Sequence, residues 1–128
     1  MKILLDTCSF LWLLADDTKL SKVAMDALAA RDTEVFLSTA SAWELSIKYA
    51  SGRMPLPERP DTFIPRGRKL SGIRSLEIDE ESALLAGRLS RFHADPFDRL
   101  LVAQAIVHGM TILTPDRHIG LYAVRVLW

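Results

Sequence analysis

The stretch from residue 95 to residue 107 constrains the fold more than any other part of the sequence. Asp95 is a good helix cap, and Pro96 suits the first helical position, where its missing N–H costs no hydrogen bond. Nearly every residue from Leu100 to Val107 is apolar. A helix that is apolar on almost all sides is buried in the protein. We therefore expect this helix to pack between a sheet and a further layer.

Short apolar runs alternate with helical patterns along the whole chain. Runs typical of strands lie near residues 3–5, 35–37, 73–78, 110–113 and 122–127. Patterns typical of helices lie near residues 10–14, 21–28, 40–49, 79–92 and 96–108. Strands that alternate with helices favour a parallel sheet covered on both faces. The predicted fold class is therefore α/β: a single three-layer α/β/α domain over residues 1–128, with a central, mainly parallel sheet of about five strands.

Residues 52–72 differ in composition from the rest of the chain. Four of the six prolines and three of the six glycines lie there. One of these prolines, Pro65, would remove a hydrogen bond from the interior of a helix. We therefore predict a loop that contains at most a broken helix.

The charge balance and the cysteine count exclude some classes of protein. The chain carries 16 basic and 16 acidic residues, so its net charge is zero, whereas a duplex-coating protein usually has a basic footprint. The single cysteine, Cys8, excludes an internal disulfide and fits a reducing compartment. No apolar run approaches the ~18 residues of a membrane span. We expect a cytoplasmic protein with no membrane segment.

Four acidic residues are expected at one edge of the sheet. Asp6 follows the first strand, Asp116 follows the fourth, Glu44 lies in the opening turns of one helix, and Asp98 lies in the first turn of another. Ligands collect outside the carboxyl ends of parallel strands. Carboxylates this close together need a compensating cation, and their oxygens suit Mg²⁺ or Mn²⁺. Such a site supports phosphodiester hydrolysis by a metal-activated water.

Four motifs that contain these acids follow one another along the chain. They are Leu4-Leu5-Asp6-Thr7, residues 38–48 with Trp43-Glu44, Asp95-Pro96-Phe97-Asp98-Arg99-Leu100-Leu101, and Leu113-Thr114-Pro115-Asp116. In type and order they resemble the PIN-domain ribonucleases and, within them, the VapC toxins of type II toxin–antitoxin modules. The resemblance implies a PIN-like fold and a metal site of Asp6, Glu44, Asp98 and Asp116 that depends on Mg²⁺ or Mn²⁺. It also implies RNA cleavage, dimerisation and inhibition by a small antitoxin.

Each of the four acids also has a purely structural interpretation. Residues 41–44 match a capping box that would employ Glu44 at a helix start. Asp98 lies three residues after a predicted cap and has the same interpretation. Asp116 fits ordinary turn chemistry. Asp6 is harder to explain in this way, because an acid that ends a buried strand needs a partner.

Residues beside these acids are candidates for substrate binding. The candidates are Thr7, Lys48, Arg99, Thr114 and Arg117. A basic cluster in the predicted loop, Arg66, Arg68, Lys69 and Arg74, is a further candidate for holding RNA, although a solvated charge run is the commoner explanation. A catalytic cysteine needs a nearby base, and no histidine lies in the opening segment. We therefore expect Cys8 to be a small core residue.

The predicted function is a metal-dependent endoribonuclease that acts as the toxin of a toxin–antitoxin module. Its expected partners are an RNA substrate, a cognate antitoxin and a second copy of itself in a homodimer. One alternative is a catalytically silent PIN-like binding protein. A less favoured alternative is a phosphoryl-transfer domain, which would need a second acid beside Asp6 or, in another class, at the position of Cys8.

Overall fold

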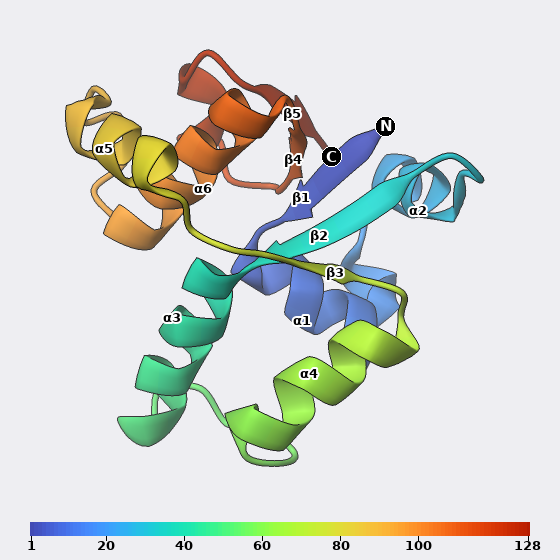
Figure 1. The fold of residues 1–128 in the computed structure, drawn as a ribbon. Coiled ribbons are helices and arrows are strands. Elements are labelled where there is room, and N and C mark those ends of the chain that lie inside the picture. Colours follow the sequence, from blue (N-terminus) through green and yellow to red (C-terminus); the bar gives the residue numbers. More distant parts are fainter.

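Five short strands form one sheet at the centre of the computed structural model, which describes residues 1–128 (Figure 1). The strands are β1 (Lys2–Leu5), β2 (Glu34–Ser38), β3 (Arg74–Leu76), β4 (Thr111–Leu113) and β5 (Arg125–Leu127). Their order across the sheet is β3-β2-β1-β4-β5, and every neighbouring pair is parallel. The predicted α/β fold with a parallel sheet is confirmed.

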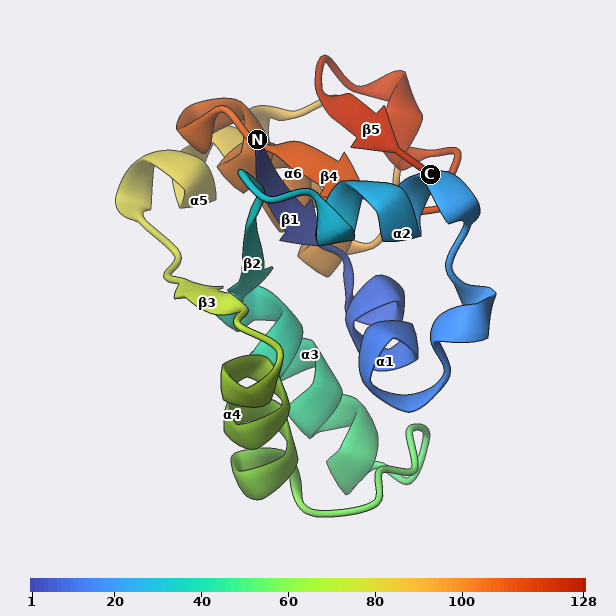
Figure 2. The ribbon, with the colours of Figure 1, turned by 90° about the vertical axis from the view of Figure 1, so that its right-hand side faces the viewer.

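Helices cover both faces of this sheet. They are α1 (Thr7–Ala15), α2 (Lys22–Ala29), α3 (Thr39–Ala50), α4 (Pro60–Leu70), α5 (Glu80–Arg88) and α6 (Pro96–His108), with short 3-10 helices η1 (Asp17–Lys19) and η2 (Ile119–Leu121). Figures 1 and 2 show α1, α2 and α4 on one side of the sheet and α5 and α6 on the other. None of the helices combines the length and the apolar character needed to cross a bilayer.

Alternate residues of the central strand face two different cores. Ile3 and Leu5 pack with residues of α1, α2 and α4, whereas Leu4 packs with residues of α6 and η2. All three side chains are fully buried. This alternation follows from the two-residue period of a strand, and it places β1 in the middle of the molecule.

Helix α6 is buried as the sequence predicts. Every residue from Leu101 to Ala105 is buried, including Gln104, whose amide accepts a hydrogen bond from Ser38 Oγ (2.5 Å). Asp95 caps the helix by accepting from the backbone N–H of Phe97 (2.9 Å). Gly109, with φ of 65°, ends it in the left-handed conformation that glycine adopts without strain.

The prediction of a loop over residues 52–72 is wrong for its second half. Helix α4 is continuous from Pro60 to Leu70 and runs through Pro65. Pro65 leaves one carbonyl without its helical partner, that of Asp61, in the exposed first turn where solvent can satisfy it. Packing outweighs this loss: Ile64 is buried in the core, and Gly67 lets α4 approach α1 because a Cβ there would clash with Leu14.

Other predicted elements are shorter than the sequence pattern indicates, and β3 covers only Arg74–Leu76 of the expected residues 73–78. Helix α5 ends at Arg88 rather than near residue 92, and β5 begins at Arg125 rather than at residue 122. The connection between α5 and α6 is held by Tyr122, whose hydroxyl donates to the carbonyl of Ser90 (2.6 Å) and accepts from the backbone N–H of His93 (3.0 Å). Ser90 and Tyr122, which lie outside the shortened α5 and β5, therefore hold this connection in place.

Candidate active site

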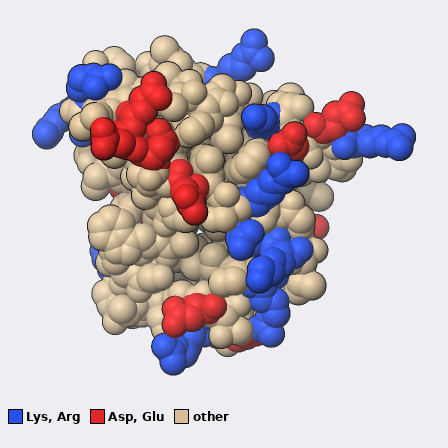
Figure 3. All heavy atoms as spheres, viewed as in Figure 1, with Lys and Arg blue, Asp and Glu red and all other residues tan.

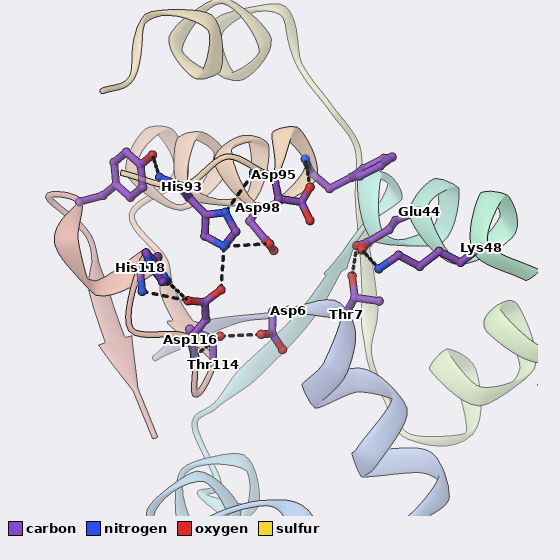
Figure 4. Close-up of polar contacts among 12 residues, drawn as sticks. Asp6, Thr7, Glu44, Lys48, His93, Asp95, Asp98, Thr114, Asp116 and His118 are labelled. Atoms are coloured by element: carbon purple, nitrogen blue, oxygen red, sulfur yellow. Dashed lines mark hydrogen bonds and ion pairs between the residues drawn. The ribbon is translucent and has the colours of Figure 1, made fainter. Parts of the chain in front are cut away.

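The four predicted acids meet at the carboxyl edge of the sheet (Figure 4). Asp6 directly follows β1, Asp116 follows β4, Glu44 lies on α3 and Asp98 lies in the first turn of α6. They surround a cavity of about 220 Å³. The residues that line it are Asp6, Thr7, Cys8, Glu44, Lys48, Asp95, Asp98, Pro115 and Asp116.

Asp6 is buried and held by two hydrogen bonds. One carboxylate oxygen caps α1 by accepting from the backbone N–H of Ser9 (2.8 Å), and the other accepts from Thr114 Oγ1 (2.5 Å). Burial raises the pKa of Asp6, and the hydrogen bonds from Thr114 and Ser9 offset part of that rise. The carboxylate therefore sits in a fixed orientation at the wall of the cavity.

Glu44 does not cap its helix, so the capping-box interpretation is wrong. The cap of α3 is Ser38, which accepts from the backbone N–H of Ala40 (3.0 Å). Glu44 is buried in the second turn and accepts from Thr7 Oγ1 (2.6 Å) and from Lys48 Nζ (2.6 Å). The bond to Glu44 raises the pKa of Lys48. Glu44 is thus the acid of the site that already has a cation beside it.

Of the four acids, Asp98 is the one whose ionised form the site destabilises most. Burial, and next the charge of Asp95, raise its pKa to about 7. Its side chain is 19% exposed, and its Oδ2 lies 3.2 Å from His93 Nε2. An anion in these surroundings calls for a neighbouring positive charge.

Asp116 has both carboxylate oxygens engaged by histidine residues. Oδ1 accepts from the backbone N–H of His118 (2.8 Å), and Oδ2 lies 2.7 Å from His93 Nε2. Burial by itself would raise the pKa of Asp116, but these hydrogen bonds outweigh it and the pKa is lowered. The predicted turn chemistry is present, and it aims the second oxygen toward Asp98.

Sequence reasoning missed His93. This residue lies in the connection before α6, and its ring reaches Asp98 and Asp116 at once, as Figure 4 shows. One ligand atom from each of His93, Asp98 and Asp116 lies within 4.8 Å of the others. No spacing rule points to this histidine, because Asp116 is 23 residues away and the approach depends on the path of the connection.

The structure separates the five candidates for substrate binding. Thr7 and Thr114 donate to acids of the site, Lys48 pairs with Glu44, and Arg117 is exposed. Arg99 is engaged in the local structure, because its Nη2 donates to two carbonyls near the end of α5, those of Ala86 (3.0 Å) and Leu89 (2.8 Å). Its role in substrate binding stays a prediction.

Cys8 is exposed and lines the cavity, so the prediction of a core residue is wrong. It lies in the first turn of α1, directly after two residues that face the site. Partial burial and then the charges of Asp6 and Glu44 raise the pKa of its thiol. A thiol with a raised pKa is a poor nucleophile at neutral pH.

The basic cluster lies on α4 and β3 rather than on a loop. Figure 3 shows Lys and Arg gathered over this part of the surface, and Asp and Glu gathered over α5. Three of the four basic side chains have partners: Arg66 pairs with Glu58, Arg74 with Glu34 (3.3 Å), and Arg68 donates to a backbone carbonyl. Most of this cluster therefore serves the local structure.

The chain is similar to known proteins in sequence and in fold. The model of the PIN domain family matches residues 3–125. The chain is 30% identical to Ribonuclease VapC22 of Mycobacterium tuberculosis over 118 residues, which cover 91% of this chain and 88% of that protein. It is 38% identical to Ribonuclease VapC16 of the same organism over only 45 residues, 35% of this chain and 32% of the relative. The crystal structure of VapBC2 from Rickettsia felis, bound to a DNA fragment from its promoter, has a similar fold. Its TM-score is 0.72 at 15% identity, covering 98% of this chain and 97% of that chain.

Proposed function

Because this chain belongs to the PIN-domain family and is a VapC-type member of it, we propose that it is a metal-dependent endoribonuclease, the toxin of a toxin–antitoxin pair. The observation that carries the proposal is the meeting of four carboxylates at one small cavity. The substrate is RNA, as the name of the full-length relative VapC22 indicates for that protein. The reaction is hydrolysis of a phosphodiester bond.

The donor set of the cavity fits a hard divalent cation. Asp6, Glu44, Asp98 and Asp116 supply oxygen atoms, which Mg²⁺ and Mn²⁺ prefer. Burial raises the pKa values of Asp6 and Asp98, and a cation bound between them would restore the charged forms. When bound, such an ion lowers the pKa of a water molecule and stabilises the leaving oxygen.

The surrounding residues orient the acids. Thr114 and the backbone N–H of Ser9 fix Asp6, so that it needs little reorganisation when the cation enters. Thr7 and Lys48 fix Glu44 on the opposite side of the cavity. The side chain of Lys48 is 34% exposed, so its ammonium group can also contact a phosphate of the substrate.

The partners of the proposed toxin follow from its family. VapBC2, whose fold is similar, was solved as a complex, which supports an antitoxin as the partner of this chain. We also propose a homodimer, as the family resemblance implies, and a cytoplasmic location, where the RNA substrate is found. Binding of an antitoxin would be measured by co-purification with the product of the neighbouring gene.

Cleavage of total cellular RNA by the purified protein tests the proposal directly. We expect discrete fragments with Mg²⁺ or Mn²⁺, and none with EDTA or with the Asp98→Asn variant. Asp61→Asn is the matched control, because Asp61 is an exposed acid on α4 that pairs only with Arg59. Intact RNA in every lane, together with metal binding by calorimetry, would instead support a catalytically silent binding protein.

A further inference from the structure

The ring of His93 lies between two acids of the proposed metal site (Figure 4). Its Nε2 is 2.7 Å from Asp116 Oδ2 and 3.2 Å from Asp98 Oδ2. The ring is largely buried, with 15% of the side chain exposed. Asp98 comes from the first turn of α6 and Asp116 from the segment after β4. His93 therefore contacts acids from two separate parts of the chain, and no hydrogen bond joins these two acids directly.

The hydrogen bonds of the ring assign its tautomer. The backbone N–H of Asp95 donates to His93 Nδ1 (3.1 Å), so this nitrogen carries a lone pair and not a proton. In a neutral imidazole the proton is then on Nε2. That N–H donates to Asp116 Oδ2 (2.7 Å), and Asp98 Oδ2 lies 3.2 Å from the same nitrogen.

Contacts on the other sides hold the ring in this position. The backbone N–H of His93 donates to the hydroxyl of Tyr122 (3.0 Å), and that hydroxyl donates to Ser90 (2.6 Å). The ring of His118 packs edge-on against it, with centroids 5.6 Å apart. Backbone and ring are therefore both fixed before any ligand arrives, as expected of a residue that orients others.

We propose that His93 is a positioning residue, which donates its Nε2–H to the Asp116 carboxylate and, at 3.2 Å from Asp98 Oδ2, holds both carboxylates in place for the cation. The proposal rests on the proposed metal-dependent function of the same site. A partner that orients a ligating carboxylate commonly changes metal affinity by about 10- to 100-fold. His93 thus completes the site without touching the ion.

The same hydrogen bonds argue against His93 as a direct ligand. To bind a cation, Nε2 must be free of its proton, and the proton would then move to Nδ1. There it would face the N–H of Asp95, two donors against each other. Direct ligation would therefore break a hydrogen bond that the capping residue of α6 makes.

Binding of Mn²⁺ to the wild type and to two variants tests the proposal. We expect His93→Ala to raise the dissociation constant for Mn²⁺, measured by calorimetry, by about 10- to 100-fold. His93→Gln keeps an N–H donor at a similar reach and should recover most of that loss. His108→Ala is the matched control, because His108 forms a comparable pair with Asp79 (2.9 Å) outside the site. It should bind Mn²⁺ as the wild type does.

Pulsed electron paramagnetic resonance of the Mn²⁺ complex separates positioning from ligation. We expect no coupling of directly bound ¹⁴N in the wild type. Such a coupling, if lost in His93→Ala, would overturn the proposal in favour of a ligand role. Equal affinity in the wild type and in a folded His93→Ala protein, as judged by its melting temperature, would also overturn it. If Asp98→Asn binds Mn²⁺ as tightly as the wild type, the proposed metal site itself fails, and the positioning role fails with it.

Discussion

The two ends of the sheet differ in what surrounds them. At the carboxyl end, a cavity of about 220 Å³ is lined by charged and polar side chains, with one hydrophobic residue among nine. At the amino end, a larger cavity of about 540 Å³ lies beside the first residues of β1, β4 and β5, and six of its ten residues are hydrophobic. Its only charged side chains are Lys2 and Arg125. The candidate active site is therefore identified by the acids that line it and not by the volume of its cavity.

The difference arises from the direction of the strands. All five strands are parallel, so each one delivers its following residues to the same edge. There, Asp6 begins α1, and Ser38 begins the helix that carries Glu44. At the other edge the chain only returns from the helices, through turns such as Gly109. The carboxyl end therefore collects acidic and polar side chains, whereas the residues at the amino end are mostly apolar.

Asp6→Asn, at the carboxyl end of the sheet, should have the largest effect on RNA cleavage. We expect RNA cleavage to fall by about 10³-fold or more, because one of the proposed ligands of the cation is lost. The fold should persist, because asparagine caps a helix as well as aspartate does. The melting temperature should stay the same or rise, since burial raises the pKa of Asp6 and a neutral side chain avoids that penalty.

Arg125→Gln at the amino end is the control for this experiment. It removes a charge beside the larger cavity and should leave cleavage unchanged. Full activity of a folded Asp6→Asn protein would contradict the assignment of the carboxyl end as the active site.

The stability of the metal-free protein should depend on pH in an unusual direction. The pKa of Asp98 is raised to about 7 from 3.8, so the folded protein keeps a proton that the unfolded chain releases above about pH 4. Stability therefore falls as the pH rises through this window. Asp6, whose pKa is also raised, acts in the same direction.

Thermal melting at about pH 5 and about pH 8, with and without Mg²⁺, checks this dependence. The metal-free protein should melt at a lower temperature at the higher pH. Mg²⁺ should remove most of the difference, because a bound cation stabilises the charged carboxylates. An Asp98→Asn protein with the same pH dependence as the wild type would show that this carboxyl is not its source.

The sequence predicted the sheet and the four acids because both follow from local rules. Apolar runs specify strands, and parallel strands bring Asp6, Glu44, Asp98 and Asp116 to one edge. His93 could not be predicted, because it reaches Asp116 only through a connection that Tyr122 holds in place.

Two of the errors of local structure have identifiable causes. Pro65 lies within a helix because long-range packing of α4 against α1 outweighs one lost hydrogen bond. Cys8 lines the cavity because α1 begins at Thr7, directly after β1, and this start turns the first residues of the helix toward the acids. Packing between helices therefore decides the position of Pro65, and the start of α1 decides that of Cys8.

Lys48→Met should have a smaller effect than loss of an acid. Glu44 would keep its hydrogen bond from Thr7 but lose the cation at 2.6 Å, and a contact to substrate phosphate would go with it. We expect cleavage to fall by about tenfold, the effect of roughly 1.4 kcal/mol. Lys48→Arg keeps the charge and should retain most of the activity. Equal losses in both variants would point to the shape of the side chain instead of its charge.

Gly109→Ala should give the smallest effect and should act only on stability. Gly109 ends α6 at φ of 65°, and a Cβ there meets no other atom within 4 Å, so the penalty comes from the backbone alone. We expect a loss of about 1 kcal/mol, or roughly 3–5 °C in melting temperature, with unchanged cleavage per folded molecule. Gly87→Ala, in the last turn of α5 where a Cβ meets no other atom, is the matched control and should stabilise the protein by up to about 1 kcal/mol. If Gly109→Ala instead reduced cleavage while the protein stayed folded, the two ends of the sheet would be coupled through α6, which carries Asp98 at its other end.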